Sequence, residues 1–244
     1  PNYVIFDHGS TAGDIDNDGD IDIVNTNLDG SLTCWMNRGG GYMSKRTCGN
    51  IFAFAIELAD MNSDGFLDIV HGAHEFEGGP NSATGISYNN GRGSFGRTKR
   101  LTEIPAWGTV PELSVADLDG DGDQDIVLSR VGELYAGVAI QVLENTGNGI
   151  KFNSTIYELV IPPSGYVAKG EGNPWNFFVE QLRFADVDRD GDTDIMMVNH
   201  GGDTHDKYHG YDPLPTGSWM RNNGDMKFTF MRGPKGSQIK VIPD

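Results

Sequence analysis

One acidic pattern occurs four times in this chain and constrains its fold more than any other feature. Each copy reads Asp-x-Asp/Asn-x-Asp-Gly-x-x-Asp followed by two apolar residues, and the copies begin at Asp14, Asp60, Asp117 and Asp186. Oxygen ligands at positions 1, 3 and 5, a glycine at position 6 and a backbone carbonyl at position 7 form the first half of a calcium loop. Because all these ligands are oxygens, the pattern favours Ca²⁺ over zinc or copper.

The second half of the pattern differs from an EF-hand, which requires a bidentate Glu at position 12. That position holds Asn25, His71, Leu128 and Met197, so no copy qualifies. The closing carboxylate stands at position 9 instead, and it opens a run of strand-forming residues. We therefore predict four Ca²⁺ sites in loops that join strand to strand. The predicted ligand positions are Asp14, Asp16, Asp18, Asp20, Asp22, Asp60, Asn62, Asp64, Phe66, Asp68, Asp117, Asp119, Asp121, Asp123, Asp125, Asp186, Asp188, Asp190, Asp192 and Asp194.

Each acidic loop is followed by the same order of elements. A strand leaves the loop, a variable segment intervenes, and a third strand leads through an Asn/Gly-rich turn into a fourth, as in Asn145-Thr146-Gly147-Asn148-Gly149. Four antiparallel strands per repeat predict an all-β fold, a β-propeller of four-stranded blades. A β-sandwich is the alternative, but it would not need the same loop in every unit. We expect one propeller over residues 1–244, or part of a larger one, with repeats at about 9–48, 51–101, 112–160 and 177–232.

The two ends of the sequence extend this pattern. Tyr3–Phe6 has the character of a fourth strand of a preceding blade, and Gln238–Ile242 has that of the first strand of a following one. Either the ring closes through these ends, or further blades lie outside this sequence.

The charge of the chain excludes some functions. The formal net charge is −17, and about half of the 35 acidic residues belong to the four loops. The rest of the surface is nearly balanced and has no basic stripe, which argues against nucleic-acid binding. No apolar run reaches the length of a membrane span. The two cysteines, Cys34 and Cys48, flank a predicted hairpin turn, and their expected register is offset, so a disulfide and two free buried thiols both remain open.

The repeats resemble FG-GAP or VCBS repeats, the calcium-loop blades of integrin α-subunit propellers and of many secreted bacterial and fungal proteins. Two features depart from that pattern: Asn62 replaces an Asp, and the flanking Gly-Ala-Pro signature is only echoed in Val70-His71-Gly72-Ala73-His74. The resemblance implies an extracellular or cell-surface location. It does not settle function, because the family includes adhesion modules, lectins and propeller domains of polysaccharide-degrading enzymes.

Strand alternation predicts where a ligand would bind. The calcium loops and the tight turns share one end of the blades, so every long connection falls at the opposite end, over 71–84, 102–112, 129–137, 161–176 and 199–217. Long loops on a rigid scaffold often carry binding residues. These loops hold five of the six histidines. The candidate ligand-binding residues are His71, His74, Trp107, Tyr166, Trp175, His200, Asp203, His205, Tyr208, His209 and Tyr211.

Three functions fit these features. The first is a calcium-stabilised extracellular recognition module that binds a glycan or a protein through the long-loop end. The second is the propeller domain of a carbohydrate-active enzyme such as a polysaccharide lyase, with a His or Tyr as base. The third is a structural module of a large surface protein. The sequence lacks G-x-S-x-G, H-E-x-x-H and a phosphate loop, so no catalytic residue is assigned and binding is favoured over catalysis.

Overall fold

The computed structural model describes residues 9–27, 29–77, 83–164, 175, 178–200 and 214–233. Within these ranges the strands form four antiparallel sheets of four strands each, paired in chain order. The first two sheets are β1 (Ser10–Gly13), β2 (Asp22–Thr26), β3 (Ser31–Asn37) and β4 (Met43–Asn50), then β5 (Ala55–Ala59), β6 (Asp68–Gly72), β7 (Gly85–Asn89) and β8 (Phe95–Arg100). The last two are β9 (Thr109–Ala116), β10 (Asp125–Val131), β11 (Val138–Asn145) and β12 (Phe152–Val160), then β13 (Phe178–Ala185), β14 (Asp194–His200), β15 (Trp219–Asn222) and β16 (Phe228–Met231).

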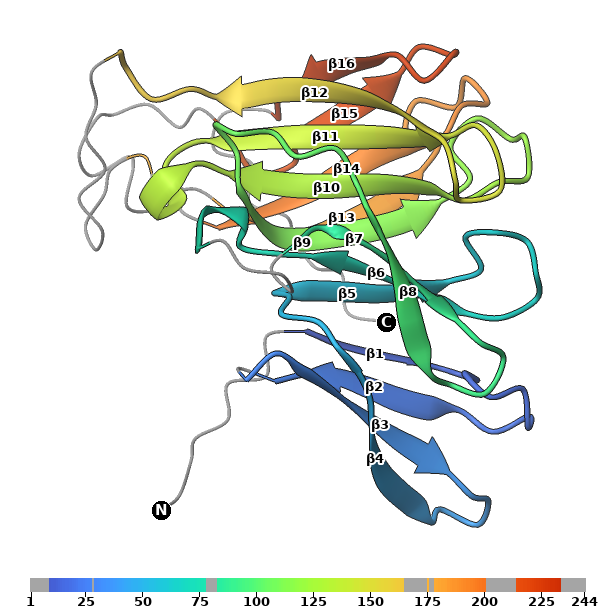
Figure 1. Cartoon of the computed structure of the whole chain (residues 1–244). Coiled ribbons are helices and arrows are strands. Elements are labelled where there is room, and N and C mark those ends of the chain that lie inside the picture. The colour runs from blue at the N-terminus through green and yellow to red at the C-terminus, as the bar shows by residue number, and fades with distance from the viewer. Residues whose placement is uncertain are drawn as a thin grey trace.

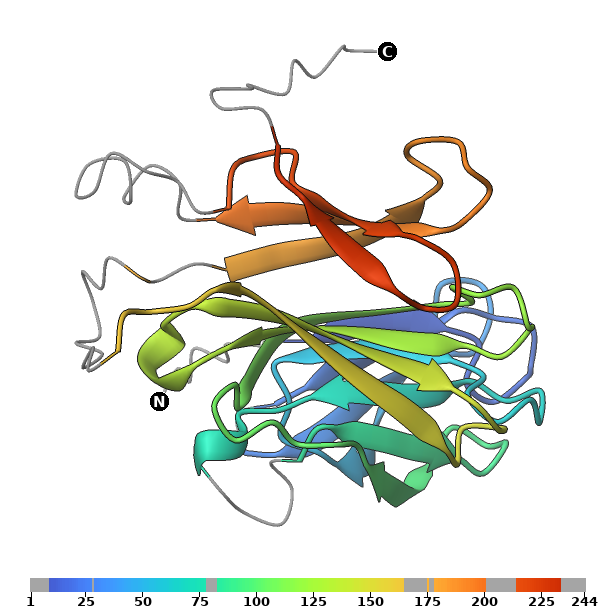
Figure 2. The same cartoon turned by 90° about the horizontal axis from the view of Figure 1, so that it is seen from above.

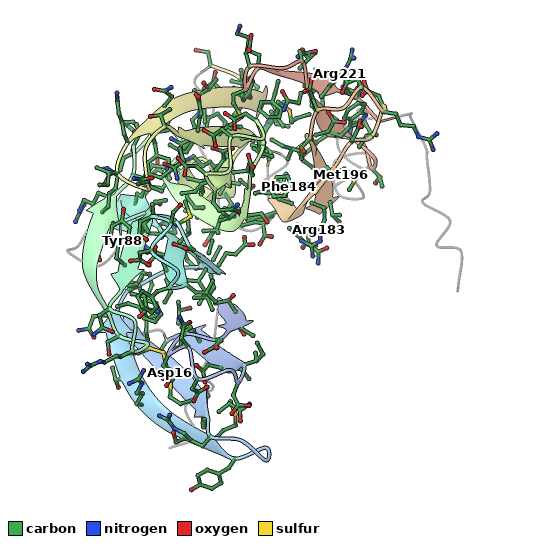
Figure 3. The ribbon with its side chains drawn as sticks, turned by 90° about the vertical axis from the view of Figure 1, so that its right-hand side faces the viewer. Asp16, Tyr88, Arg183, Phe184, Met196 and Arg221 are labelled. Atoms are coloured by element: carbon green, nitrogen blue, oxygen red, sulfur yellow. A yellow bond between two sulfur atoms is a disulfide. The ribbon has the colours of Figure 1, made fainter. Side chains whose placement is uncertain are left out.

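These four sheets are propeller blades, as the repeat pattern predicted, and we call them blades 1 to 4. The first strands of neighbouring blades pack side by side, β1 on β5, β5 on β9 and β9 on β13. Figure 3 shows the blades as an open arc, with Asp16 in blade 1 near one end and Met196 and Arg221 in blade 4 at the other. The predicted strands Tyr3–Phe6 and Gln238–Ile242 lie outside the described residues.

The two ends of the blades differ as the strand alternation predicted. The acidic loops and the tight turns project from one end of the sheets, and the β6–β7 and β10–β11 connections project from the other (Figures 1 and 2). Each of those two connections contains a short 3-10 helix, η1 (Glu75–Glu77) or η2 (Glu133–Tyr135). We call the second end the long-loop face.

The connections over 71–84, 102–112 and 129–137 are shorter than predicted because the strands run further into them. Strand β6 ends at Gly72 and β10 at Val131, so the predicted starts at His71 and Ser129 were wrong. Strand β9 begins at Thr109, so the connection predicted over 102–112 ends earlier than predicted. The physical reason is burial: all residues of β6 and β10 are buried between neighbouring blades, and their backbone groups therefore pair in the sheet.

Three apolar clusters fill the junctions between consecutive blades. Loop positions 10 and 11 supply the central contacts, because consecutive strand residues point to opposite faces. Position 11 of one blade and position 10 of the next lie in the same cluster. These pairs are Val24 with Ile69, Val70 with Ile126, and Val127 with Ile195.

A disulfide joins Cys34 on β3 to Cys48 on β4, with the Cα atoms 5.8 Å apart. As expected, the two cysteines are not directly opposite each other in the strand pair, since Cys34 is opposite Arg46. A register shift between Leu32 and Thr33 leaves Cys48 as the extra residue on β4. The bond closes diagonally at this bulge, and it settles the question that the sequence left open.

Candidate metal loops and ligand-binding face

The position-1 aspartate organises each acidic loop by accepting backbone N–H bonds from inside the turn. Asp14 accepts from Asp18 at 3.1 Å and from Gly19 at 2.9 Å. Asp60 and Asp186 accept from the same two positions of their own loops, and Asp117 accepts from Gly120 and Gly122, at distances of 2.7–3.1 Å. The position-6 glycines have positive φ, for example 93° at Gly19, which lets the chain fold back around these carboxylates.

The position-9 aspartate connects the loop to the rest of its blade. Asp125 accepts the backbone N–H of Leu118 at 2.9 Å and that of Asn145, at the end of β11, at 2.8 Å. Asp22, Asp68 and Asp194 make the same two bonds in their blades. All four are buried. Loss of hydration raises the pKa of Asp68 to about 6 and that of Asp125 to about 7.

Three of the loops bring at least three carboxylates within reach of one ion. In each case ligand oxygens lie within 4.8 Å of one another. The sets are Asp14, Asp16 and Asp18; Asp117, Asp119 and Asp125; and Asp186, Asp188 and Asp194. No such carboxylate group forms in the described second loop, where Asn62 stands at position 3 and donates to Asp64 at 2.9 Å.

The donor set fits a hard divalent cation. All ligand atoms are oxygens, and one of them, Asp16 Oδ1, is buried without a hydrogen-bond partner in the described structure. Burial, and then the charges of Asp18 and Asp22, raise the pKa of Asp16, which a bound cation would reverse. The clusters include neither the position-7 residues Asp20, Asp123 and Asp192 nor the predicted side-chain ligands Asp22, Asp121 and Asp190.

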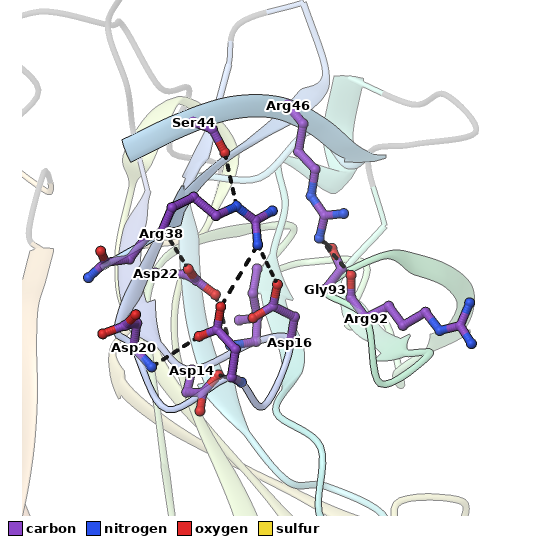
Figure 4. Close-up of polar contacts among 12 residues, drawn as sticks. Asp14, Asp16, Asp20, Asp22, Arg38, Ser44, Arg46, Arg92 and Gly93 are labelled. Carbon is purple, nitrogen blue, oxygen red and sulfur yellow. Dashed lines mark hydrogen bonds and ion pairs between the residues drawn. The ribbon is translucent and has the colours of Figure 1, made fainter. Parts of the chain in front are cut away.

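Two arginines approach the first and fourth loops. Arg38 Nη1 lies 3.4 Å from Asp16 and 3.8 Å from Asp18 (Figure 4). In blade 4, Arg221 forms ion pairs with Asp188 at 2.7 Å and Asp190 at 2.9 Å. These contacts raise the pKa of Arg221, first through the hydrogen bond to Asp190. Among the described residues no arginine pairs with the third loop.

The structure places the predicted ligand-binding residues in different environments. His71 is buried in β6, its Nε2 lies 3.3 Å from Ser87 Oγ, and burial lowers its pKa to about 4. Its assignment to a ligand-facing loop was therefore wrong. Trp107 is also buried, and its indole N–H donates to Glu158 at 2.8 Å. Trp175 packs against the core between blades 3 and 4. His200 ends β14 opposite Phe178. Tyr166, Asp203, His205, Tyr208, His209 and Tyr211 lie outside the described residues.

His74 is the centre of a group of rings that the sequence did not reveal. Its ring centroid lies 5.6 Å from that of Phe54, 6.0 Å from Phe76 and 6.2 Å from Tyr135. Tyr135 in turn lies 5.4 Å from Phe178, so the group spans blades 2 to 4. We call these five residues the aromatic row. The only sequence signal was an aromatic residue near the start of two inner strands, which core packing explains equally well.

A pocket of about 490 Å³ adjoins the aromatic row at η2. Its lining includes Trp107, Glu158, Glu133 and Leu134. Leu134 is 47% exposed and has a φ of +49°, which is strained for a residue with a side chain. Strained, exposed backbone of this kind clusters at ligand sites, where surrounding structure holds it in place.

A buried ion pair joins the 3-10 helix η1 of blade 2 to strand β10 of blade 3. Arg130, on β10, is fully buried and pairs with Glu75 of η1 through both guanidinium nitrogens, each at 3.1 Å. It also donates to Gln141 at 2.6 Å and to the carbonyl of Trp107 at 2.7 Å. With these partners the long-loop face rests on a rigid support.

Comparisons with known proteins agree with the repeat pattern. Residues 14–71, from the first acidic loop to the strand after the second, match the family model described as FG-GAP-like repeat. A search of curated proteins found no matching sequence. The described part of the chain contains no helix with the length and apolar character needed to cross a membrane.

Proposed function

We propose that this chain is a calcium-stabilised extracellular recognition module that binds a glycan or a protein partner through its long-loop face. The observation that carries the proposal is the separation of two chemistries. Acidic oxygen clusters gather at one end of the blades, and the aromatic row and its pocket gather at the other. In this view residues 1–244 belong to one propeller, whole or as part of a larger one, with repeats near 9–48, 51–101, 112–160 and 177–232.

The proposed metal is Ca²⁺, with one ion in each acidic loop. Carboxylates at positions 1, 3, 5 and 9 would hold it, with Asn62 in place of an aspartate in the second loop. A bound calcium ion supplies positive charge that offsets the repulsion among these carboxylates. The position-9 aspartates already connect each loop to the end of its third strand, so we propose a structural role for the metal.

The proposed recognition surface is the aromatic row with the pocket beside Trp107. Exposed ring faces offer apolar area to the C–H face of a sugar or to a side chain of a protein. Phe76 is 39% exposed at the edge of the row. Carboxylates at the pocket, Glu133 and Glu158, provide acceptors for hydroxyl or amide donors. The predicted residues Tyr166, His200, Asp203, His205, Tyr208, His209 and Tyr211 remain part of this proposal.

The proposed extracellular location is supported by one observation besides the repeat family, and it agrees with the proposed metal. The Cys34–Cys48 disulfide is of the kind that persists in oxidising compartments. Calcium loops of modest affinity also suit the millimolar calcium outside cells.

A glycan array and a pull-down with extracellular proteins test this proposal. We expect His74→Ala and Phe76→Ala to reduce binding, because both remove rings of the row. Tyr42→Ala is the matched control, since Tyr42 is 71% exposed in a tight turn at the opposite end. If binding survives the first two changes but is lost in Tyr42→Ala, the binding site lies at the opposite end of the blades and the proposal is wrong. Time-dependent release of unsaturated oligosaccharides from an array ligand would instead favour the lyase alternative.

A further inference from the structure

An asparagine at the end of a third strand joins two neighbouring acidic loops at each of the three junctions between blades 1 to 4. Its side-chain amide donates to the backbone carbonyl at position 2 of the preceding blade's loop, and we call this contact an asparagine link. The three links are Asn89 to Ile15 at 2.8 Å, Asn145 to Met61 at 3.3 Å and Asn222 to Leu118 at 3.2 Å. All six residues are buried, so water does not compete for these bonds.

Each asparagine is also fixed to the acidic loop of its own blade. In blade 3 the amide of Asn145 donates to the carbonyl of Gln124, at position 8, at 3.2 Å. The backbone N–H of Asn145 donates to the position-9 carboxylate of Asp125 at 2.8 Å. The asparagines of blades 2 and 4 make the equivalent two bonds in their own blades. One asparagine therefore contacts the loops of two consecutive blades.

The bonds continue through position 2 of each loop. The backbone N–H of Met61 donates to the second carboxylate oxygen of Asp68 at 3.2 Å, and Leu118 donates to Asp125 in the same way at 2.9 Å. The first and fourth loops contain the same bond. Hydrogen bonds therefore connect all four position-9 aspartates, from the first loop to the fourth.

Close packing reinforces two of the links. Gly149, in the turn after the third strand of blade 3, has a φ of +68°, and a Cβ added to it would lie 2.5 Å from the carbonyl oxygen of Met61. At the equivalent Gly93 of blade 2, a Cβ would lie 3.0 Å from the side chain of Ile15. Each turn lies directly against position 2 of the preceding loop, so neither can shift without displacing the other.

We propose, on the basis of the calcium sites proposed above, that the asparagine links make calcium binding positively cooperative between neighbouring loops. An ion fixes the position-9 carboxylate that it contacts, and thereby the asparagine that holds position 2 of the preceding loop. That loop then loses less conformational freedom when its own ion binds. Asn89, Asn145 and Asn222 are positioning residues in this scheme, because they act on the ions through the loops.

The second loop should depend most on its neighbours. Asn62 replaces a carboxylate at position 3 there and donates to Asp64 at 2.9 Å, so this loop offers the ion the weakest donor set of the four. It also takes part in two links, through Asn89 to the first loop and through Asn145 to the third blade. We therefore expect the second loop to fill with calcium only when the adjoining loops do.

A calcium titration followed by NMR tests the coupling loop by loop. The reporters are the position-6 glycine amides, which donate to the position-1 aspartates: Gly19, Gly65, Gly122 and Gly191. The double variant Asp119→Asn, Asp121→Asn disables the third loop without a change of side-chain size. We expect the calcium affinity of the second and fourth loops to fall about five-fold or more. The first loop, two links away, should change less.

Adding Asn145→Ala separates the links from the electric field of the lost carboxylates. This change removes the link between the second and third loops and keeps the link through Asn222 to the fourth. In the Asn145→Ala background, disabling the third loop should no longer lower the affinity of the second loop, but should still lower that of the fourth. Asn222→Ala should give the reverse pattern. A field acts through space and would persist in both backgrounds. Melting curves in EDTA check that the variants fold.

The outcomes distinguish the coupling from the calcium sites themselves. If no loop binds calcium, the proposed metal and the coupling are both wrong. If calcium binds, but the second and fourth loops do not respond to loss of the third, the coupling alone is wrong, and this result needs no asparagine variant. A response of the second loop that survives Asn145→Ala also overturns the coupling, because the lost charge then explains it.

Discussion

The guanidinium of Arg221 donates to the carboxylate of Asp190 at 2.9 Å, so a side chain of the third strand in blade 4 neutralises part of the acidic loop beside it. Arg38 approaches the first loop in the same way, and no described arginine does so at the third loop. The four loops are thus not electrostatically equal, although their sequences are nearly the same.

We predict that Arg221→Gln increases the calcium affinity of the fourth loop by a few fold, because the guanidinium competes with the ion for the same carboxylates. The contact is exposed, so the effect stays small. Calcium titration by calorimetry measures it. Arg189→Gln is the matched control: it removes the same charge from the same loop, where Arg189 makes no ion pair within the described structure. If calcium affinity increases equally in both variants, the lost positive charge explains the effect and the contact of Arg221 with the carboxylates does not.

We predict that calcium removal lowers the melting temperature substantially. Extracellular calcium modules have a Kd of about 10⁻⁴–10⁻³ M. At about 1 mM calcium and the tight end of that range, each site adds about 1.4 kcal/mol, and four sites add roughly 5–6 kcal/mol. Melting curves with EDTA, and again with excess calcium restored, measure this effect. A melt that EDTA leaves unchanged, or fewer than three bound ions per chain, would contradict the assignment.

We predict that the calcium-free protein loses stability as pH rises from about 4 to about 7. Burial raises the pKa of Asp68 to about 6 and those of Asp125 and Glu112 to about 7. The folded state therefore holds more protons than the unfolded state in this window, and its stability falls as those protons leave. With calcium the trend should weaken or reverse, because calcium binds the deprotonated carboxylates. Urea unfolding at pH 5 and pH 7.5, with EDTA and with calcium, gives the two slopes.

We predict that loss of the disulfide destabilises the protein by about 3 kcal/mol, the value typical of a closed loop near 15 residues. The two cysteines are 14 residues apart. Urea unfolding of the Cys34→Ala, Cys48→Ala double variant measures the loss. A reductant provides the control. It should lower the stability of the wild type to that of the double variant, and it should not change the stability of the double variant.

We predict that Glu75→Gln costs about 3 kcal/mol or more, because it leaves Arg130 charged and fully buried beside a neutral partner. Combined replacement by Arg130→Met and Glu75→Met should cost less than Glu75→Gln alone, since no unpaired charge then remains. The free energies of unfolding of the wild type, of Glu75→Gln and of the double variant test this prediction. A double variant that is less stable than Glu75→Gln would show that the pair contributes more than charge compensation.

The sequence by itself determined the acidic loops, the strand order and the end of the blades at which each connection lies. The reason is that these features are local. The predicted side-chain ligands of each loop fall within nine consecutive residues, and strand alternation then assigns every connection to one end. Even the departure at Asn62 was visible, and it coincides with the described loop in which no three-carboxylate cluster forms.

Only the tertiary structure decided which side chains on the long-loop face are accessible and which copies of the motif are covered by a described neighbouring blade. His71 lies in β6 and Trp107 in the β8–β9 connection, and the packed fold buries both. The ring contacts of the aromatic row join residues from three blades, and no local pattern encodes them. Ile23 and Ile69 have the same place in the same motif, yet only Ile69 has a blade packed over it. Burial depends on what lies across the junction, and that is a property of the packed fold and not of the repeat.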